Sequence, residues 1–352
     1  MKPATMIKYR EALAIAMAEA MKDPRTLLIG QGVTDFKGIW GTTTGLSEKY
    51  PTRVIETPLS EDGIAGVCIG ASLNGMYPIN THIRADFGLL IFNQLINLAA
   101  KYRYMFGGLF EVPMMFRMVI GRSWGQGAQH SQSFQSLLGH IPGLAVLMPS
   151  NPKSIIDSYR YAREHHKGPV VMFEHRLMYE LEFENEHGEN YLNPFGTRIE
   201  RIGSDVTIVA TSVMVLEAVR AADYLLQFGI NAEIIDLHSI SHPDHDLIFN
   251  SVKKTGRLLV ADTSWLPYGV AAEMSRVIAE KDPTILKQPI KSLGMQPAPC
   301  PTAKTLEDFY YPDVRDIVNL SATLVNGDEN HKIPLPFKQA MTDFYKHFKG
   351  PF

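Results

Sequence analysis

Short apolar runs alternate with helical segments along almost the whole chain, and the alternation falls into two blocks. The first block fills residues 1–180 and the second fills residues 197–325. Residues 181–196, between them, are acidic, carry Gly and Pro and show little periodicity, which is typical of a linker. The apolar run at residues 169–173 indicates a strand covered on both faces, as in a parallel sheet. The sequence therefore predicts two doubly wound α/β domains, with a C-terminal extension over residues 326–352.

The periodicity also places the individual elements. Strands are expected at residues 26–29, 54–55, 78–81, 112–120, 144–148, 169–173, 206–210, 232–237, 257–261 and 290–293. Helices are expected at residues 9–21, 63–75, 87–103, 152–164, 213–228 and 270–281, and residues 1–10 also have a polar, helical pattern. The segment Ser241-His242-Pro243-Asp244 reads as a turn with a helix cap, with a metal site as the alternative.

The composition excludes several classes of function. The formal net charge is -3, from 34 basic and 37 acidic side chains, and no block of like charge occurs. Nucleic acid and a membrane surface are therefore not expected as partners. The two cysteines, Cys68 and Cys300, form neither a disulfide framework nor a metal-binding spacing. No apolar run has the length of a membrane span, and the first residues lack the apolar core of a signal peptide, so we expect a cytoplasmic protein.

Glu61 is the first candidate for chemistry. It follows the turn Pro58-Leu59-Ser60, between an apolar run and a helix rich in Gly and Ala. A carboxylate in that place is poorly solvated and close to a helix N-terminus. It can therefore hold a proton donor or a protonated ring nitrogen in a dry cleft. The alternative is that Ser60 or Glu61 only caps the helix.

His130 is the second candidate, in a loop rich in Gly, Gln and Ser. Glycines at positions 121, 125 and 127 let the backbone approach a ligand closely. An imidazole there can donate to a developing oxyanion or shuttle a proton, and a structural role is the alternative. Both candidates follow predicted strands, where open α/β sheets bind their ligands.

Five ordered stretches of the first domain share the spacing of one family. They are RVIETPLSE at 53–61, GVCIGASLNG at 66–75, NLAAKYRYMFGG at 97–108, GAQHSQ at 127–132 and GHIPGL at 139–144, and residues 235–237, 251–258 and 268–273 also fit. The chain resembles, from about residue 5 to about residue 320, the beta subunits of thiamin-diphosphate-dependent 2-oxo acid dehydrogenases of the pyruvate and branched-chain type, within the transketolase-like superfamily. The resemblance implies a pyrimidine-binding first domain and a transketolase C-terminal-type second domain.

The resemblance also implies roles for individual residues. Glu61 would hydrogen-bond the aminopyrimidine ring of thiamin diphosphate and favour the imino tautomer that activates the cofactor. Phe87 matches the aromatic residue that packs on this ring, and Leu59 and Ile83 match apolar wall positions; ordinary core packing is the alternative for these three. His130 matches a histidine near the reacting carbon, which would assist decarboxylation or acyl transfer.

The metal loop of the cofactor's diphosphate end is missing from the chain. Mg2+ is usually held by a Gly-Asp-Gly segment, and none occurs here; Gly327-Asp328-Glu329-Asn330 is read as a loop. The resemblance therefore implies that an alpha subunit supplies the metal ligands, in a heterotetramer with two copies of each chain. A lipoyl acyltransferase core is a further partner that the sequence leaves open.

Several departures from the family concern the substrate. Gln31 and Gly32 replace two glutamates, and Arg84, Arg122 and Trp124 are additions. Arg84 or Arg122 is expected to bind a carboxylate, a phosphate or a hydroxylated group, with an internal salt bridge such as Arg84 to Asp86 as the alternative.

Three functions follow from these residues. The first is the beta subunit of a 2-oxo acid dehydrogenase-like enzyme that decarboxylates a 2-oxo acid and passes on the acyl or aldehyde unit. The second is thiamin-diphosphate-dependent ketol or acyl transfer to a sugar-type acceptor, which the added arginines keep open. The third is a catalytically silent scaffold subunit, against which the intact Glu61, Phe87 and His130 argue.

Overall fold

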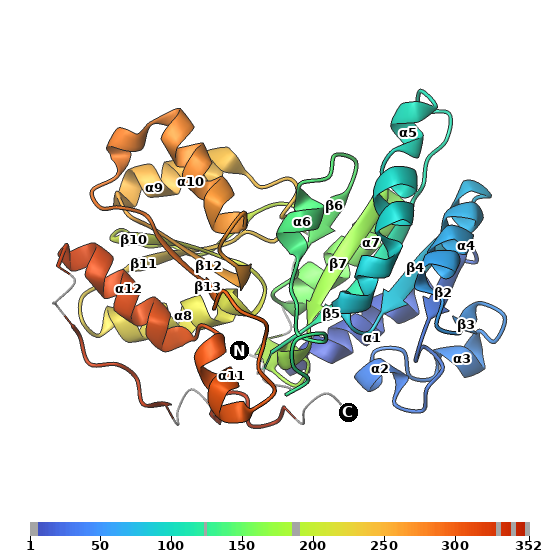
Figure 1. The fold of residues 1–352 in the computed structure, drawn as a ribbon, viewed down its shortest axis with the longest axis horizontal. Helices are drawn as coiled ribbons and strands as arrows, with labels where there is room; N and C mark the ends of the chain where they lie inside the picture. The colour runs from blue at the N-terminus through green and yellow to red at the C-terminus, as the bar shows by residue number, and fades with distance from the viewer. Residues whose placement is uncertain (1–5, 123–124, 185–190, 329–331, 339–342, 349–352) are drawn as a thin grey trace, which may run out of the picture. The chain divides into compact units, whose positions relative to one another are not determined.

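The computed structural model describes residues 6–122, 125–184, 191–328, 332–338 and 343–348 (Figure 1). The chain divides into two compact units. The first comprises residues 1–121 and 129–195, and the second comprises residues 122–128 and 196–352. Each unit is a mostly parallel sheet flanked by helices, which confirms the predicted doubly wound α/β architecture.

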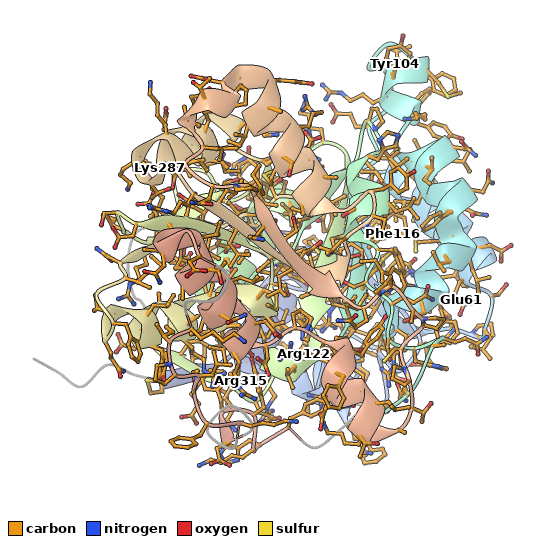
Figure 2. All side chains as sticks on the ribbon, turned by 60° about the vertical axis from the view of Figure 1, so that its left-hand side comes forward. Glu61, Tyr104, Phe116, Arg122, Lys287 and Arg315 are labelled. Carbon is orange, nitrogen blue, oxygen red and sulfur yellow. The ribbon has the colours of Figure 1, made fainter. Side chains whose placement is uncertain are left out.

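The first unit is built on a six-stranded parallel sheet with the strand order β3-β2-β4-β5-β7-β6. The strands are β2 (Thr26–Gly30), β3 (Val54–Glu56), β4 (Tyr77–His82), β5 (Met114–Ile120), β6 (Ala145–Leu147) and β7 (Pro169–His175). Every residue of β4, β5 and β7 is buried, as expected for central strands of a covered parallel sheet. Phe116, in the middle of β5, is fully buried (Figure 2).

Three long helices flank this sheet: α1 (Tyr9–Ala20), α4 (Glu61–Leu73) and α7 (Pro152–Glu164). α7 begins as predicted, because the Asn151 side chain accepts a hydrogen bond from the Ser154 N–H at 2.8 Å and Pro152 takes the first helical position. The shorter helical elements are α2 (Gly38–Gly41), α3 (Leu46–Lys49), α5 (Tyr102–Met105), α6 (Gln135–Gly139) and the 3-10 turn η3 (Arg176–Met178).

The prediction of one continuous helix over residues 87–103 is wrong. The segment is a 3-10 stretch η1 (Ala85–Ile91), a π-helical stretch η2 (Asn93–Ala99) and the short α5. Gly88 of η1 lies close to β5, since a Cβ there would come within 2.9 Å of Met118 Cε. Packing of this segment against β5 therefore sets the backbone path, and local helix propensity does not.

Two short strands, at the start of the chain and at the start of the predicted linker, were not predicted. Residues Met6–Lys8, predicted as helical, form β1, which pairs antiparallel with β8 (Glu182–Glu184). The Tyr9 N–H also donates to the Leu181 carbonyl at 3.1 Å. The first residues of the predicted linker therefore pack on the first unit, through a partner too distant in sequence for periodicity to reveal. Residues 185–190 lie outside the described ranges.

The second unit is built on a five-stranded sheet with the order β13-β12-β10-β11-β9, in which only the edge strand β9 is antiparallel. The strands are β9 (Arg198–Arg201), β10 (Val206–Ala210), β11 (Ala232–Asp236), β12 (Leu258–Trp265) and β13 (Lys291–Met295). In Figure 1, α8 (Val213–Leu226) and α12 (Val314–Asn326) cover one face, and α9 (His245–Thr255) and α10 (Val270–Lys281) cover the other. α11 (Lys304–Tyr310) and the 3-10 turn η4 (Pro283–Ile285) complete the unit.

Two helices of the second unit, α9 and α12, begin at side-chain caps. Asp244 accepts a hydrogen bond from the Leu247 N–H at 2.9 Å and caps α9, which confirms the predicted turn and cap. α12 was not predicted, although Asp313 and Asp316 form a capping box at its start. Gly327 ends α12 in the left-handed conformation, and residues 329–330 of the Gly-Asp segment lie outside the described ranges.

Across the described ranges, the helices are too short or too polar to cross a bilayer.

Candidate active site

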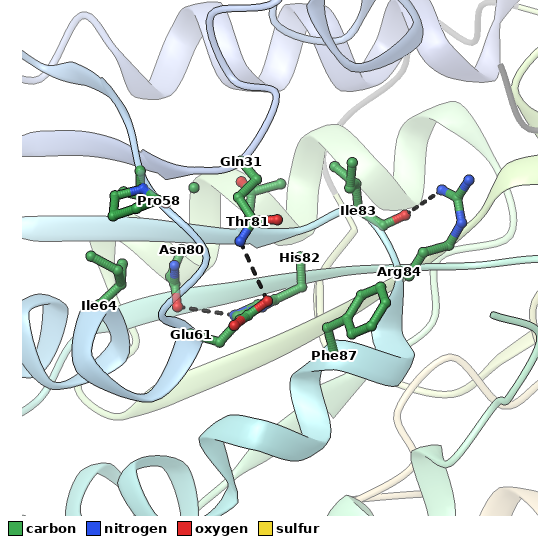
Figure 3. Close-up of a pocket in the computed structure, with 12 residues that line it drawn as sticks. Gln31, Pro58, Glu61, Ile64, Asn80, Thr81, His82, Ile83, Arg84 and Phe87 are labelled. Carbon is green, nitrogen blue, oxygen red and sulfur yellow. Dashed lines mark hydrogen bonds between the residues drawn. The ribbon is translucent and has the colours of Figure 1, made fainter. Parts of the chain in front are cut away.

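A small pocket lies in the first unit where β2 and β4 end and α4 begins (Figure 3). β2 and β4 are neighbouring parallel strands, with Gly30 opposite Thr81. A Cβ at Gly30 would come within 2.5 Å of the Thr81 carbonyl oxygen, so only glycine allows this close approach. The pocket is lined by Gly30, Gln31, Thr57, Pro58, Glu61, Ile64, Asn80, Thr81, His82, Ile83, Arg84 and Phe87.

Glu61 is the first residue of α4, and its carboxylate lies in the pocket. The side chain is half-buried, and its Oε1 accepts a hydrogen bond from Gln31 Nε2 at 3.3 Å. Ser60 occupies the capping position without a side-chain capping hydrogen bond in the described part of the chain. The start of the helix favours a negative charge here, so Glu61 presents an anionic acceptor to the pocket.

Phe87 and Ile83 supply apolar walls, and Phe87 connects the pocket to His130. The Phe87 side chain is 38% exposed, and Ile83 is half-buried. The His130 ring meets the Phe87 ring edge-on, with 5.4 Å between the ring centroids. Leu59, the other predicted wall residue, is 82% exposed and does not line this pocket. The structure therefore brings Glu61, Ile83, Phe87 and His130 together and leaves Leu59 outside.

Comparison with known proteins identifies the two units. Residues 5–182 match the transketolase pyrimidine-binding domain, and residues 196–317 match the transketolase C-terminal domain. The chain is 36% identical over 327 residues to the acetoin:2,6-dichlorophenolindophenol oxidoreductase subunit beta of Cupriavidus necator, covering 89% of this chain and 95% of that one. It is 38% identical over 325 residues to the mitochondrial pyruvate dehydrogenase E1 component subunit beta of Bos taurus, covering 90% and 89%.

The chain belongs to the beta-subunit family of thiamin-diphosphate-dependent 2-oxo acid dehydrogenases. A solved structure titled as a split-gene transketolase, inactive beta4 tetramer, superposes with a TM-score of 0.73 at 21% identity and covers 90% of this chain and 97% of that one. That likeness shows the shared fold, and the family assignment confirms the resemblance expected from the sequence.

This family depends on thiamin diphosphate, and the residues of the pocket can be compared with the two ends of that cofactor. A half-buried carboxylate and a partly exposed phenyl ring form a cradle for a flat, nitrogen-bearing ring. By contrast, the described residues contain no group of three His, Cys, Asp or Glu side chains close enough to hold a metal ion. The residues present therefore fit the pyrimidine end of thiamin diphosphate and offer no cluster for a metal at the diphosphate end.

His82 also lines the pocket, although no role was predicted for it. It is buried, and its Nε2 lies 3.0 Å from Asn80 Oδ1. Asn80 Nδ2 donates to the Ile29 carbonyl at 3.3 Å, which leaves Oδ1 to accept, so we assign the proton to His82 Nε2. Burial lowers the pKa of His82 to about 4. The ring is therefore neutral near pH 7, with Nδ1 as an acceptor. The position of His82 at the end of a buried strand was the feature of the sequence that could have indicated it as a site residue.

The depressed pKa of His82 predicts a pH-dependent stability. The unfolded chain protonates this ring near pH 6.5 and the folded chain only near pH 4, so stability falls as pH drops through that window. Between pH 7 and pH 4.5 the loss should reach about 2 to 3 kcal/mol, and His82→Gln should remove it. Urea unfolding across this range measures the effect, with His140→Gln, an exposed histidine, as control. Identical pH slopes for wild type and His82→Gln would contradict it.

Asp86 connects η1 to the His130 loop. Its Oδ1 accepts hydrogen bonds from Gln132 N–H at 3.2 Å and from Gln132 Nε2 at 2.9 Å. Burial raises the pKa of Asp86, and the hydrogen bonds from Gln132 act against that rise. The carboxylate therefore ties the segment two residues after His130 to the segment that carries Phe87.

Arg84 and Arg122 have different surroundings. Arg84 lines the pocket, and its Nη1 donates to the Ile83 carbonyl at 2.7 Å. Arg122 belongs to the second unit, is 8% exposed, lies 3.2 Å from Glu217 and donates to the Pro312 carbonyl (Figure 2). The guanidinium of Arg122 is thus used in internal contacts, as the salt-bridge alternative expects. Trp124 lies outside the described ranges.

Proposed function

We propose that this chain is the beta subunit of a thiamin-diphosphate-dependent 2-oxo acid dehydrogenase-like enzyme and supplies the pyrimidine half of the cofactor site. The enzyme would remove CO2 from a 2-oxo acid and transfer the remaining acyl or aldehyde unit. The observation that carries this proposal is the half-buried carboxylate of Glu61, which shares one pocket with the partly exposed ring of Phe87. The family membership supports it.

The residues of the pocket have separate tasks in this proposal. When bound, thiamin diphosphate supplies the carbon nucleophile and electron sink that decarboxylation requires. Glu61 would accept a hydrogen bond from the pyrimidine ring, and Gln31 Nε2 donates to the Glu61 carboxylate at 3.3 Å and holds it in place. Phe87 and Ile83 would pack on the ring and exclude water, which would strengthen the hydrogen bond to Glu61.

His130 is proposed to act on the substrate. Its ring is half-buried and contacts the edge of Phe87, so it lies beside the wall of the pocket that holds Glu61. A neutral imidazole can accept a proton and an imidazolium can donate one, which suits a group that assists decarboxylation or acyl transfer.

The other half of the site is proposed to come from an alpha subunit. The sequence contains no Gly-Asp-Gly segment, and the described residues contain no metal-binding cluster. Mg2+ and the diphosphate would then be held by the alpha subunit, in a heterotetramer of two alpha and two beta chains. A lipoyl acyltransferase core stays a prediction, as does a cytoplasmic location; the related chain from Bos taurus carries a mitochondrial name.

The shared site predicts that cofactor binding depends on the partner. This chain alone should bind thiamin diphosphate at least about 100-fold more weakly than the assembled complex, because the metal-bridged diphosphate contacts are missing. Calorimetric titration in Mg2+, on the chain and on the complex, measures the difference. Tight Mg2+-dependent binding to the isolated chain, shown to be monomeric by sedimentation, would contradict the shared site.

A further inference from the structure

The C-terminal extension contributes a tyrosine to a buried ion-pair cluster. Glu217 of α8 is 1% exposed, and its carboxylate lies 3.2 Å from Arg122 Nη2 and 3.2 Å from Arg220 Nη1. The Tyr345 hydroxyl donates to Glu217 Oε1, the oxygen that also accepts from Arg122. All four residues belong to the second unit, and we call them the Glu217 cluster.

Tyr345 also covers the two guanidiniums of this cluster. Its ring centroid lies 5.9 Å from Arg122 Cζ and 6.0 Å from Arg220 Cζ, and the ring of Phe344 lies 4.0 Å from Arg220 Cζ. Burial raises the pKa of Tyr345 well above its usual value, and Glu217 raises it further against the opposing effect of Arg122. The hydroxyl therefore stays protonated and remains a donor to the carboxylate. An ion pair shielded from water holds its partners more firmly than an exposed one.

Arg122 begins the segment that leads to His130 (Figure 2). The same segment has a further tie to the second unit, because the Gly125 N–H donates to Glu307 Oε1 at 3.2 Å. Residues 122–128 belong to the second unit, whereas His130 belongs to the first. The Glu217 cluster therefore holds the start of the loop that carries His130.

The other side of His130 is tied to the first unit. There Asp86 accepts the two hydrogen bonds from Gln132. His130 thus lies in a loop that is held by side chains both before and after it. A group that moves a proton must be kept close to its productive geometry, and supporting contacts of this kind keep it there.

Two departures from the family meet in the Glu217 cluster. Arg122 is an addition to the family pattern, and Tyr345 lies beyond the match to the transketolase C-terminal domain, which ends at residue 317. We propose that Tyr345 is a positioning residue for His130, because it completes the Glu217 cluster and so holds Arg122 and the loop that follows. This role rests on the proposed function, in which His130 acts on the substrate.

Hydrogen–deuterium exchange on the full-length chain tests the hold on the loop without any turnover. Peptides that cover residues 122–128 should exchange at least about 10-fold faster in Tyr345→Ala, because fewer contacts then keep this segment closed. Peptides of β10 should not change, which separates a local opening from general unfolding. Tyr345→Phe keeps the ring and should exchange less than about 3-fold faster.

Phe337→Ala is the matched control for the exchange experiment. Phe337 lies in the same extension and is 87% exposed, so its removal should leave the exchange of residues 122–128 as in the wild type. Wild-type exchange of these residues in Tyr345→Ala, or equally faster exchange in β10, would overturn the proposal.

Kinetics on the assembled complex then tests the link to His130. Turnover is measured with 2,6-dichlorophenolindophenol as electron acceptor, on whichever of pyruvate and the branched-chain 2-oxo acids the wild type uses fastest. Tyr345→Ala should lower the turnover number at least about 10-fold, whereas exchange of the C2 proton of bound thiamin diphosphate should change less than about 2-fold. Adding Tyr345→Ala to His130→Ala should cost less than about 2-fold more, since Tyr345 acts through His130.

The kinetic outcomes separate this inference from the proposed function. Equal losses of turnover and of C2 proton exchange in Tyr345→Ala would indicate general damage and overturn the positioning role. The same additional loss in the His130→Ala background as in the wild type would also overturn it. Full turnover by Tyr345→Ala, with a large loss in His130→Ala, overturns this inference alone. Full turnover by His130→Ala overturns the proposed role of His130 as well.

Discussion

Glu61→Gln is expected to lower turnover by the assembled enzyme at least about 100-fold without changing its folding or assembly. The carboxylate lies in the pocket beside Phe87, and glutamine has nearly the same shape but carries no negative charge. A strong hydrogen bond of this kind lowers the barrier by several kcal/mol when water is excluded, so its loss should slow turnover about 100-fold or more.

Asp62→Asn is the matched control for this variant. Asp62 is the next residue of α4, is exposed and accepts a hydrogen bond only from the Gly63 N–H in the described structure, at 2.7 Å. It should retain nearly full activity, because it does not line the pocket. Turnover is measured with saturating thiamin diphosphate and Mg2+, and assembly is checked by sedimentation. Near wild-type turnover by Glu61→Gln in an intact complex would refute its role.

Arg117→Met is expected to destabilise the first unit by about 3 to 5 kcal/mol. Arg117 on β5 and Glu174 on β7 are fully buried and form an ion pair at 2.7 Å. Glu174 also accepts hydrogen bonds from the hydroxyls of Tyr159 and Tyr179. The proximity of the Glu174 carboxylate raises the pKa of Arg117 against the opposing effect of burial. Removing the guanidinium leaves Glu174 as a buried charge with only neutral donors.

Two comparisons separate the buried pair from ordinary ion pairs. Arg25→Met breaks an exposed pair with Asp23, also 2.7 Å long, and should cost about 1 kcal/mol or less. The double variant Arg117→Met with Glu174→Met should be more stable than Arg117→Met alone, because no unpaired charge stays buried. Chemical unfolding measures the free energy of unfolding of the wild type and of these three variants. A loss below about 1 kcal/mol for Arg117→Met would show that the network is not needed for stability.

Contacts that are local or follow the sheet could be predicted from the sequence. Glu61, Ile83 and Phe87 lie within the segments that end β4 and begin α4, so the rule that ligands bind at the carboxyl ends of strands was enough to bring them together. His130 needed the family resemblance as well, because its loop shows no periodicity that would place it beside Phe87.

Contacts between distant segments could not be predicted. Arg122 pairs with Glu217, and Trp40 meets both Arg84 and Arg176, through residues whose separation in the sequence carries no signal. The irregular η1 and η2 segments were misread as one helix for the same reason, since packing of Gly88 against Met118 overrides local propensity.

The exchange of the C2 proton of bound thiamin diphosphate for deuterium tests the central claim most directly. The assembled complex is mixed with deuterium oxide, quenched in acid at increasing times, and the residual C2 proton signal is measured by NMR, with no need to know the substrate. If Glu61 activates the cofactor, Glu61→Gln should slow exchange at least about 100-fold relative to wild type and Asp62→Asn, while the complex still binds the cofactor. Equal exchange rates in wild type and Glu61→Gln would contradict the account, because this chain would then hold the cofactor without activating it.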